Sequence, residues 1–186
     1  MKIERFYMKK NNKLIIAGVG GQGVVFLSRL FAEVALQAGD ALISYESHGM
    51  AMRGGSVSCH LKIGGFQSPI IAGGEADILL VLAKTELPNV QHLLSHSGLL
   101  FINSEIKPPN IDNSQVATIP ASSMAVEQKL TRAVNLIAAG FALAHAGFPY
   151  SVEQFHSALE RMPVNKKIRA ANIAALNLGY NKGKTS

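Results

Sequence analysis

The chain has 186 residues, a formal net charge of +6, 48% hydrophobic residues and only 16% charged residues. Its length is that of one domain, and its composition excludes a disordered chain and a long coiled coil. The single cysteine, Cys59, excludes a disulfide framework, and it excludes an iron–sulfur cluster or a zinc ribbon held by this chain alone.

The positive charge is concentrated at the two ends of the chain. Residues 1–13 carry five basic side chains and one acid, and the chain from Arg161 onward carries six basic side chains and no acid. The remaining body holds seven basic and eleven acidic residues, a net charge of −4. Basic ends of this kind are usually solvated, so we expect no nucleic-acid partner.

Neither a targeting segment nor a membrane span is indicated. The basic start is followed by an apolar run that leads into glycines rather than into a cleavage site. The longest uncharged stretch, residues 133–152, is interrupted by Asn135 and Pro149 and predicts a buried helix followed by a turn. We therefore expect a cytoplasmic protein without membrane contact.

The first third of the chain predicts a strand, a glycine turn, a helix and a second strand. The apolar run 14–17 reads as a strand that is buried on both faces. Apolar residues then recur at helical spacing over 24–38, and Gly39 is the expected helix stop. Residues 41–45 read as the second strand, which makes a right-handed βαβ unit.

The middle of the chain departs from simple alternation. Residues 47–55 read as a polar, glycine-rich loop, and 57–63 alternate strictly as a strand. After a turn at Gly64 and Gly65, residues 66–71 are expected to return as a hairpin partner despite Pro69. The further predicted elements are a strand at 78–82, a helix at 86–94, a strand at 99–103 and an edge strand at 118–119.

The last third is predicted to be helical. Residues 133–146 are apolar on nearly every side, so this helix lies in the core or under a partner chain. Ser151 and Gln154 form a capping box that opens the next helix. A final helix over 166–178 is expected to bury four residues: Ile168, Ala171, Ala175 and Leu178.

These elements predict an α/β fold, a Rossmann-like three-layer sandwich with a mostly parallel sheet, a β-hairpin excursion and a helical C-terminal third. We expect a basic N-terminal extension over 1–13, one domain over 14–180 and a basic tail over 181–186.

The first candidate site is the glycine run between the first strand and helix. Its pattern is Gly18-x-Gly20-Gly21-Gln22-Gly23, which fits G-x-G-x-x-G. Such glycines permit positive φ, allow close backbone approach and aim helix amides at an anion. Glu46, at the end of the second predicted strand, stands where a dinucleotide fold keeps its ribose-binding acid. The alternatives are a phosphate-bearing ligand and a tight turn without a ligand.

A second glycine cluster, Arg53-Gly54-Gly55-Ser56, follows seven residues after Glu46. An Arg with free amides around it can clamp phosphate or carboxylate, and it can equally be a structural Arg paired to Glu46 or Asp77. His48, in the same loop, could titrate or position a substrate.

Other candidates are weaker, and no catalytic or metal-binding residue is assigned. His92 and His96 lie four residues apart without an evident third ligand, so a solvated helix face is favoured. Cys59 is expected to be an inert core residue. The thiamine diphosphate signature Gly-Asp-Gly is missing, because Gly39-Asp40 is followed by Ala41.

Three ordered motifs carry a family resemblance. They are the Gly18–Gly23 run, the segment from Glu46 through His48-Gly49-Met50 to Arg53-Gly54-Gly55-Ser56, and Ser68-Pro69 leading to Gly74-Glu75-Ala76-Asp77. In order and spacing they resemble the gamma-type subunit of 2-oxoacid:ferredoxin oxidoreductases, the pyruvate and ketoisovalerate oxidoreductase family. The His-Gly-Met version resembles the small (beta) subunit of indolepyruvate ferredoxin oxidoreductase. Met52 departs from the Gln that the family usually has.

The resemblance implies a subunit of a complex that decarboxylates a 2-oxoacid, such as indolepyruvate or another arylpyruvate, to an acyl-CoA and reduces ferredoxin. It implies that thiamine diphosphate and iron–sulfur clusters are held by larger partner subunits, and that CoA binds in the complex. This chain would bind no cofactor alone and would be inactive when isolated.

Three hypotheses follow for the chain's own role. In the first, it is a non-redox subunit whose two glycine segments lie side by side at the strand ends, facing the active site or the CoA phosphates. In the second, it is a free-standing NAD(P)-binding Rossmann oxidoreductase. In the third, it is purely structural, and the apolar helix over 133–146 forms the interface. A homodimer through that helix is one way for the isolated chain to bury it.

Overall fold

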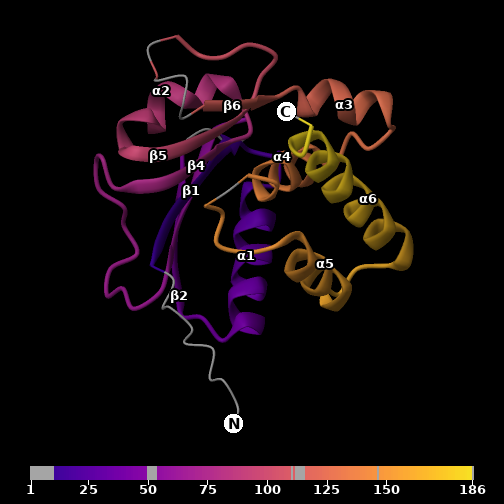
Figure 1. Cartoon of the computed structure of the whole chain (residues 1–186), viewed down its shortest axis with the longest axis horizontal. Helices are drawn as coiled ribbons and strands as arrows, with labels where there is room; N and C mark the ends of the chain where they lie inside the picture. Colours follow the sequence, from indigo (N-terminus) through magenta and orange to yellow (C-terminus); the bar gives the residue numbers. More distant parts are fainter. Residues whose placement is uncertain (1–10, 50–53, 110, 112–115, 146, 186) are drawn as a thin grey trace.

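The computed structural model describes residues 11–49, 54–109, 111, 116–145 and 147–185. Its centre is a six-stranded sheet with the spatial order β2-β3-β1-β4-β5-β6 (Figure 1). The strands are β1 (Asn12–Val19), β2 (Leu42–His48), β3 (Ser56–Ile63), β4 (Ala76–Val81), β5 (Leu94–Asn103) and β6 (Val116–Ile119). Strands β1, β4, β5 and β6 are parallel neighbours, whereas β3 is antiparallel to both β1 and β2. The predicted α/β fold with a mostly parallel sheet is confirmed.

Helices cover both faces of this sheet unequally. They are α1 (Val24–Ala38), α2 (Leu87–Val90), α3 (Ala121–Glu127), α4 (Val134–Leu143), α5 (Val152–Arg161) and α6 (Lys166–Gly183). Figure 1 shows α1, α4, α5 and α6 together on one side of the sheet. The other face is covered by α2, by the short 3-10 turns Lys84–Glu86 and Gln91–Leu93 that flank it, and by the segment after β3.

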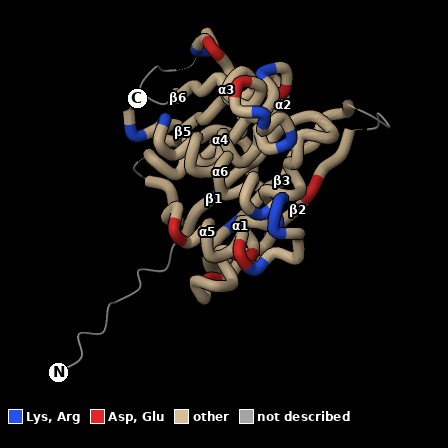
Figure 2. The backbone as a smooth tube through the Cα atoms, turned by 90° about the vertical axis from the view of Figure 1, so that its right-hand side faces the viewer, with Lys and Arg blue, Asp and Glu red and all other residues tan. Residues whose placement is uncertain are grey.

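The apolar run in β1 explains why two cores form. Successive side chains of a strand point to opposite faces, so Leu14 and Ile16 join the large core under α1, whereas Ile15 and Ala17 join the smaller core under α2. All four residues are buried, as the sequence pattern predicts for a strand covered on both faces. Figure 2 marks the positions of the charged residues along the backbone; among them, Lys62 and Glu86 are buried.

The hairpin partner predicted at 66–71 is wrong, because these residues form no strand. Both edges of β3 are already paired, one with β1 and the other with β2, so no edge is left for a returning segment. The antiparallel excursion is instead the β2–β3 pair, and β2 continues through Ser47 and His48, which the sequence placed in a loop. The segment after β3 crosses the sheet face, where Ile71 is buried and donates its backbone N–H to Nδ1 of His60 at 3.1 Å.

This contact predicts a pH dependence of stability. His60 is only 8% exposed, and burial together with the charge of Lys62 lowers its pKa below 6.5. The unfolded chain therefore takes up a proton at a higher pH than the folded chain does, so the free energy of unfolding decreases as the pH falls below about 6.5. In His60→Asn this part of the decrease should disappear, as measured by urea unfolding at a series of pH values between 5 and 8. The same substitution at the exposed His92 is the matched control, and equal pH slopes in wild type and His60→Asn would contradict the assignment.

Several helical predictions need correction. The helix expected over 86–94 is reduced to α2 and its flanking turns, because β5 already begins at Leu94. Helix α3 was not predicted at all, and α6 continues to Gly183. Ile168, which was expected to be buried by α6, is 47% exposed. The capping box of α5 is confirmed, since Gln154 Oε1 accepts a hydrogen bond from the Ser151 amide at 2.9 Å.

Helix α4 lies in the core of its own chain. Every residue from Asn135 to Leu143 is buried by other parts of the same chain. Helix α6 packs against α4 so closely that a Cβ on Gly140 would overlap the Leu176 carbonyl, and a Cβ on Gly179 would overlap the Ile137 carbonyl. The apolar surface of α4 is therefore covered within the chain, and the hypothesis that this helix forms an interface between chains is wrong.

Within the described ranges, no helix is both long and apolar enough to cross a membrane.

Candidate functional site

The glycine loop (Gly18–Gly23) connects the end of β1 to the start of α1. Gly21 and Gly23 have φ values of 94° and 79°, a conformation that side chains rarely adopt. At Gly18 the reason is space, since a Cβ would come within 2.8 Å of Gln22 Oε1 and 2.9 Å of Val24 Cγ2. The first helical hydrogen bond runs from Leu27 to the Gly23 carbonyl at 3.0 Å. The amides of residues 24–26 therefore precede the hydrogen-bonded turns and face the loop.

The two glycine segments lie side by side, as the first hypothesis expected of them. The Gly20 amide donates to the Gly55 carbonyl at 2.9 Å, and a Cβ on Gly20 would come within 3.5 Å of the Gly54 amide nitrogen. Gly54 has a φ of 70°, and Ser56 opens β3 opposite Val19. Arg53 and Met52 lie outside the described residues.

Glu46 and His48 lie on β2, which is separated from β1 by the intervening strand β3. The carboxylate of Glu46 is 3.7 Å from Nε2 of His48. Val57 of β3 pairs with Gly18 of β1 on one side and with His48 of β2 on the other. At ordinary strand spacing, the backbones of Gly18 and His48 are therefore about 10 Å apart. In a dinucleotide-binding fold the acidic residue follows the strand next to the glycine loop. Here β3 occupies that position, so the geometry does not favour a ribose contact by Glu46.

Gln22 closes the sheet's carboxyl edge between β1 and β4. Its Oε1 accepts from the Val19 amide at 2.9 Å, and its Nε2 donates to the Leu82 carbonyl at 3.4 Å. The same carbonyl accepts from Nδ2 of Asn103 at 2.9 Å, and that nitrogen also lies 2.8 Å from the Ser122 hydroxyl. Gln22, Asn103 and Ser122 line a polar hollow of about 480 Å³ at this edge. The crevice at the strand ends is therefore bridged by side chains of the chain itself.

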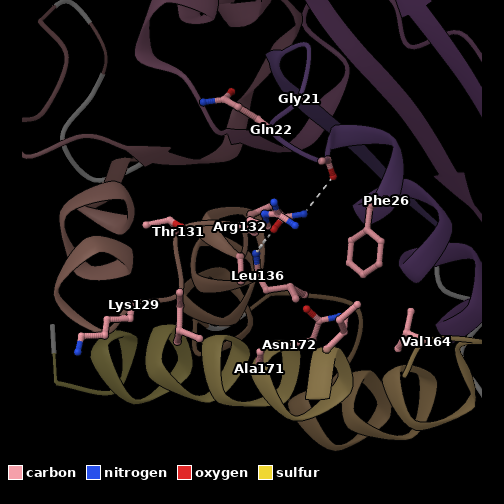
Figure 3. Close-up of a pocket in the computed structure, with 15 residues that line it drawn as sticks. Gly21, Gln22, Phe26, Lys129, Thr131, Arg132, Leu136, Val164, Ala171 and Asn172 are labelled. Carbon is pink, nitrogen blue, oxygen red and sulfur yellow. Dashed lines mark hydrogen bonds between the residues drawn. The ribbon is translucent and has the colours of Figure 1, made fainter. Parts of the chain in front are cut away.

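A second pocket, of about 450 Å³, lies on the helical side of the glycine loop (Figure 3). Its walls come from Gly21–Gly23 and Phe26, from the turn 129–133 between α3 and α4, and from α6. Asn135 joins the starts of the two helices, because its Nδ2 donates to the Gly23 carbonyl at 3.2 Å and its Oδ1 accepts from the Leu136 amide at 2.9 Å. We name this cavity the α6 pocket.

The single cysteine is unsuited to redox chemistry or metal binding. Cys59 is buried in β3, facing α1, and is not in a disulfide. Burial, and then the negative charge of Glu46, raise the pKa of its thiol to about 11. The predicted core position is confirmed, and because thiolate is the form that attacks and ligates, the raised pKa agrees with an inert residue.

The remaining sequence candidates are separated or structural. His92 lies in a 3-10 turn and His96 in β5, so they share no helix face. In the described part of the chain, no three His, Cys, Asp or Glu side chains come together as a metal site would require. Gly39 caps α1 with a φ of 74°, and Asp40 accepts a hydrogen bond from Tyr150 at 3.0 Å. This dipeptide therefore serves the helix end, not a diphosphate.

The third sequence motif fastens the start of the sheet. Asp77 Oδ2 accepts from the Lys13 amide at 2.8 Å, and Glu75 Oε2 accepts from Lys13 Nζ at 3.0 Å. The hydrogen bond and charge of Lys13 lower the pKa of Glu75. Because β1 and β4 begin here, this motif lies at the amino edge, opposite the glycine loop.

Sequence reasoning missed two groups of residues at the site. Asn103 is the last residue of the buried strand β5, at the end where parallel sheets present ligands, so that signal was available. Arg132 and Lys129 line the α6 pocket from a turn after α3, a helix that no sequence pattern indicated.

Comparisons with known proteins match most of the chain to one family of oxidoreductase subunits. A family model described as "Pyruvate ferredoxin/flavodoxin oxidoreductase" matches residues 13–182. The indolepyruvate oxidoreductase subunit IorB of Archaeoglobus fulgidus is 30% identical, with 91% of this chain and 94% of the relative covered. The pyruvate synthase subunit PorC of Thermotoga maritima is 25% identical, with 91% and 93% covered.

Solved structures share the fold. The pyruvate oxidoreductase subunit PORC of Thermotoga maritima superposes with a TM-score of 0.76 at 24% identity, covering 93% of this chain and 97% of that one. A chain of the 2-oxoglutarate:ferredoxin oxidoreductase of Magnetococcus marinus superposes with a TM-score of 0.78 at 19% identity. This match covers 96% of the present chain but only 32% of that longer chain.

Proposed function

Because the chain belongs to the pyruvate ferredoxin/flavodoxin oxidoreductase family, we propose that it is the non-redox subunit of a 2-oxoacid:ferredoxin oxidoreductase complex. Such a complex decarboxylates a 2-oxoacid oxidatively, forms an acyl-CoA and passes electrons to ferredoxin. The likeness to the IorB subunit supports indolepyruvate or another arylpyruvate as the substrate.

The observation that carries the non-redox role is the single buried cysteine. An iron–sulfur cluster needs several thiolates, and this chain has one, which is in the core and has a raised pKa. The dipeptide Gly39-Asp40 does not serve thiamine diphosphate either, because Gly39 caps α1 and Asp40 accepts a hydrogen bond from Tyr150. Both groups, and CoA chemistry, are therefore assigned to the assembled complex with its larger subunits, and the isolated chain is expected to be inactive.

The chain's own contribution is the carboxyl edge of its sheet. There the glycine loop and the segment Gly54–Ser56 are joined by the Gly20–Gly55 hydrogen bond, and both are proposed to face the partner's active site or the phosphates of CoA. The rival NAD(P)-dependent role loses support, because β3 separates Glu46 from β1.

The test is an anaerobic affinity purification of this chain from its own cells, followed by native mass spectrometry. We expect a larger, cysteine-rich subunit with thiamine diphosphate bound. Recovery of the chain alone, or with a nicotinamide dinucleotide, would contradict the proposal.

A second measurement concerns Arg53 in the assembled complex. Arg53→Ala should raise the KM for CoA or lower turnover, whereas Arg29→Ala, on the exposed face of α1, should change neither. Unchanged kinetics in Arg53→Ala would remove Arg53 from the site.

A further inference from the structure

The α6 pocket combines apolar walls with a positive rim. Phe26 enters it from α1, and Val164 and Ile168 come from the start of α6 and the loop before it. Figure 3 shows Phe26 and Val164 on one side of the cavity and Ala171 and Asn172 along its base. Its volume of about 450 Å³ lies within the range of pockets that enclose small molecules.

The charges around the pocket favour an anion. Arg132 and Lys129 line it, and none of the described lining residues is an Asp or a Glu. Neither cation is in an ion pair with any described residue. The starts of α1 and α4 border the same space and add their positive dipole ends. An anionic group would thus enter a positive field without meeting a carboxylate.

The apolar residues point to an organic body on that anion. The sequence pattern of α6 places Ile168 with the buried face of the helix, yet its side chain is 47% exposed and lines this pocket. Phe26, in the first turn of α1, is likewise only partly buried, although Val24 and Leu27 on either side of it are in the core. A ligand with an apolar body would cover both side chains and recover the burial that the pattern predicts.

We propose that the α6 pocket binds a small carboxylic acid with an apolar body. Its carboxylate lies beside Arg132 and the starts of α1 and α4, and its body packs against Phe26 and Ile168. The preference for an apolar anion rests on the pocket alone. The choice of an aromatic acid as the probe rests on the proposed function, in which an arylpyruvate is the substrate and the product carries an arylacetyl group.

The experiment is calorimetric titration of the full chain with four probes. Indole-3-acetate should bind, its neutral isostere indole-3-acetamide should bind at least about tenfold more weakly, and acetate should not bind measurably, because it lacks the apolar body. Inorganic phosphate serves as the fourth probe. Equal binding of the acid and the amide, or binding of phosphate in preference to indole-3-acetate, would overturn the proposal.

Variants locate the site. Arg132→Gln and Ile168→Glu should each weaken indole-3-acetate binding by about tenfold or more. Arg161→Gln and Ala170→Glu are the matched controls, since both residues are exposed and neither lines the pocket. Unchanged affinity in Arg132→Gln would overturn the assignment.

A second result would also overturn it: an Ile168→Glu chain that keeps its affinity for the acid but no longer assembles with its partner. The surface would then be a protein interface. The purification described above is independent of this titration, so failure of one leaves the other standing.

Discussion

Gly179→Ala should destabilise the protein strongly, although it adds only one methyl group. The new Cβ would overlap the Ile137 carbonyl, and neither backbone can move without displacing a helix of the core. We expect a loss of about 3 kcal/mol in the free energy of unfolding, the upper part of the range for overpacked cores. Since domains of this kind have about 5–15 kcal/mol in total, a large decrease in the urea midpoint should be seen.

The matched control is Gly73→Ala. A Cβ there has one neighbour, the His92 carbonyl oxygen at 3.7 Å, which is ordinary contact. This variant should lie within about 0.5 kcal/mol of wild type. If Gly179→Ala unfolded at the same urea concentration as Gly73→Ala, the close approach of α4 and α6 would be incorrect.

Asn135→Leu should also have a large effect. The substitution keeps the side chain branched at Cγ with the same number of heavy atoms, but it removes both hydrogen bonds of a buried amide, one to the Gly23 carbonyl and one from the Leu136 amide. Leaving such groups unpaired costs about 2 kcal/mol. The glycine loop should also lose its fixed position, so hydrogen exchange at residues 21–26 should accelerate more than exchange in β4.

Asn181→Leu provides the comparison, because this residue is exposed near the end of α6. It should change stability by no more than about 0.5 kcal/mol and leave exchange in the loop unaltered. Loop exchange that is equally slow in wild type and Asn135→Leu would show that Asn135 does not hold the loop.

The sequence predicted most helices and strands, because hydrophobic periodicity and helix caps depend on residues that are close together in the chain. The glycine loop, α1 and its stop at Gly39 follow from periodicity and cap chemistry, and all three are in the structure. The comparisons confirm the resemblance that the three motifs indicated. The order of the strands could not be predicted in this way, since nothing in β3 itself says that both of its edges will be paired.

In the candidate site too, features that depend on local sequence were predicted and features that depend on distant segments were not. The two glycine segments were expected to lie side by side at the strand ends, and the hydrogen bond from Gly20 to Gly55 joins them there. The α6 pocket was not foreseen, because its walls come from three segments that are distant in sequence, one of them after the unpredicted helix α3. Burial of Ile168 was predicted from helical spacing, which describes a face of α6 but not what lies opposite it.

The insertion of β3 also determines which strand borders the sheet. With β3 beside β1, the outermost strand on that side is β2, whose exposed residues include Glu46 and His48. Charged and titratable side chains on a border strand discourage the addition of a foreign strand, and so protect against edge-to-edge aggregation of sheets. Addition of a partner's strand along that border is therefore disfavoured.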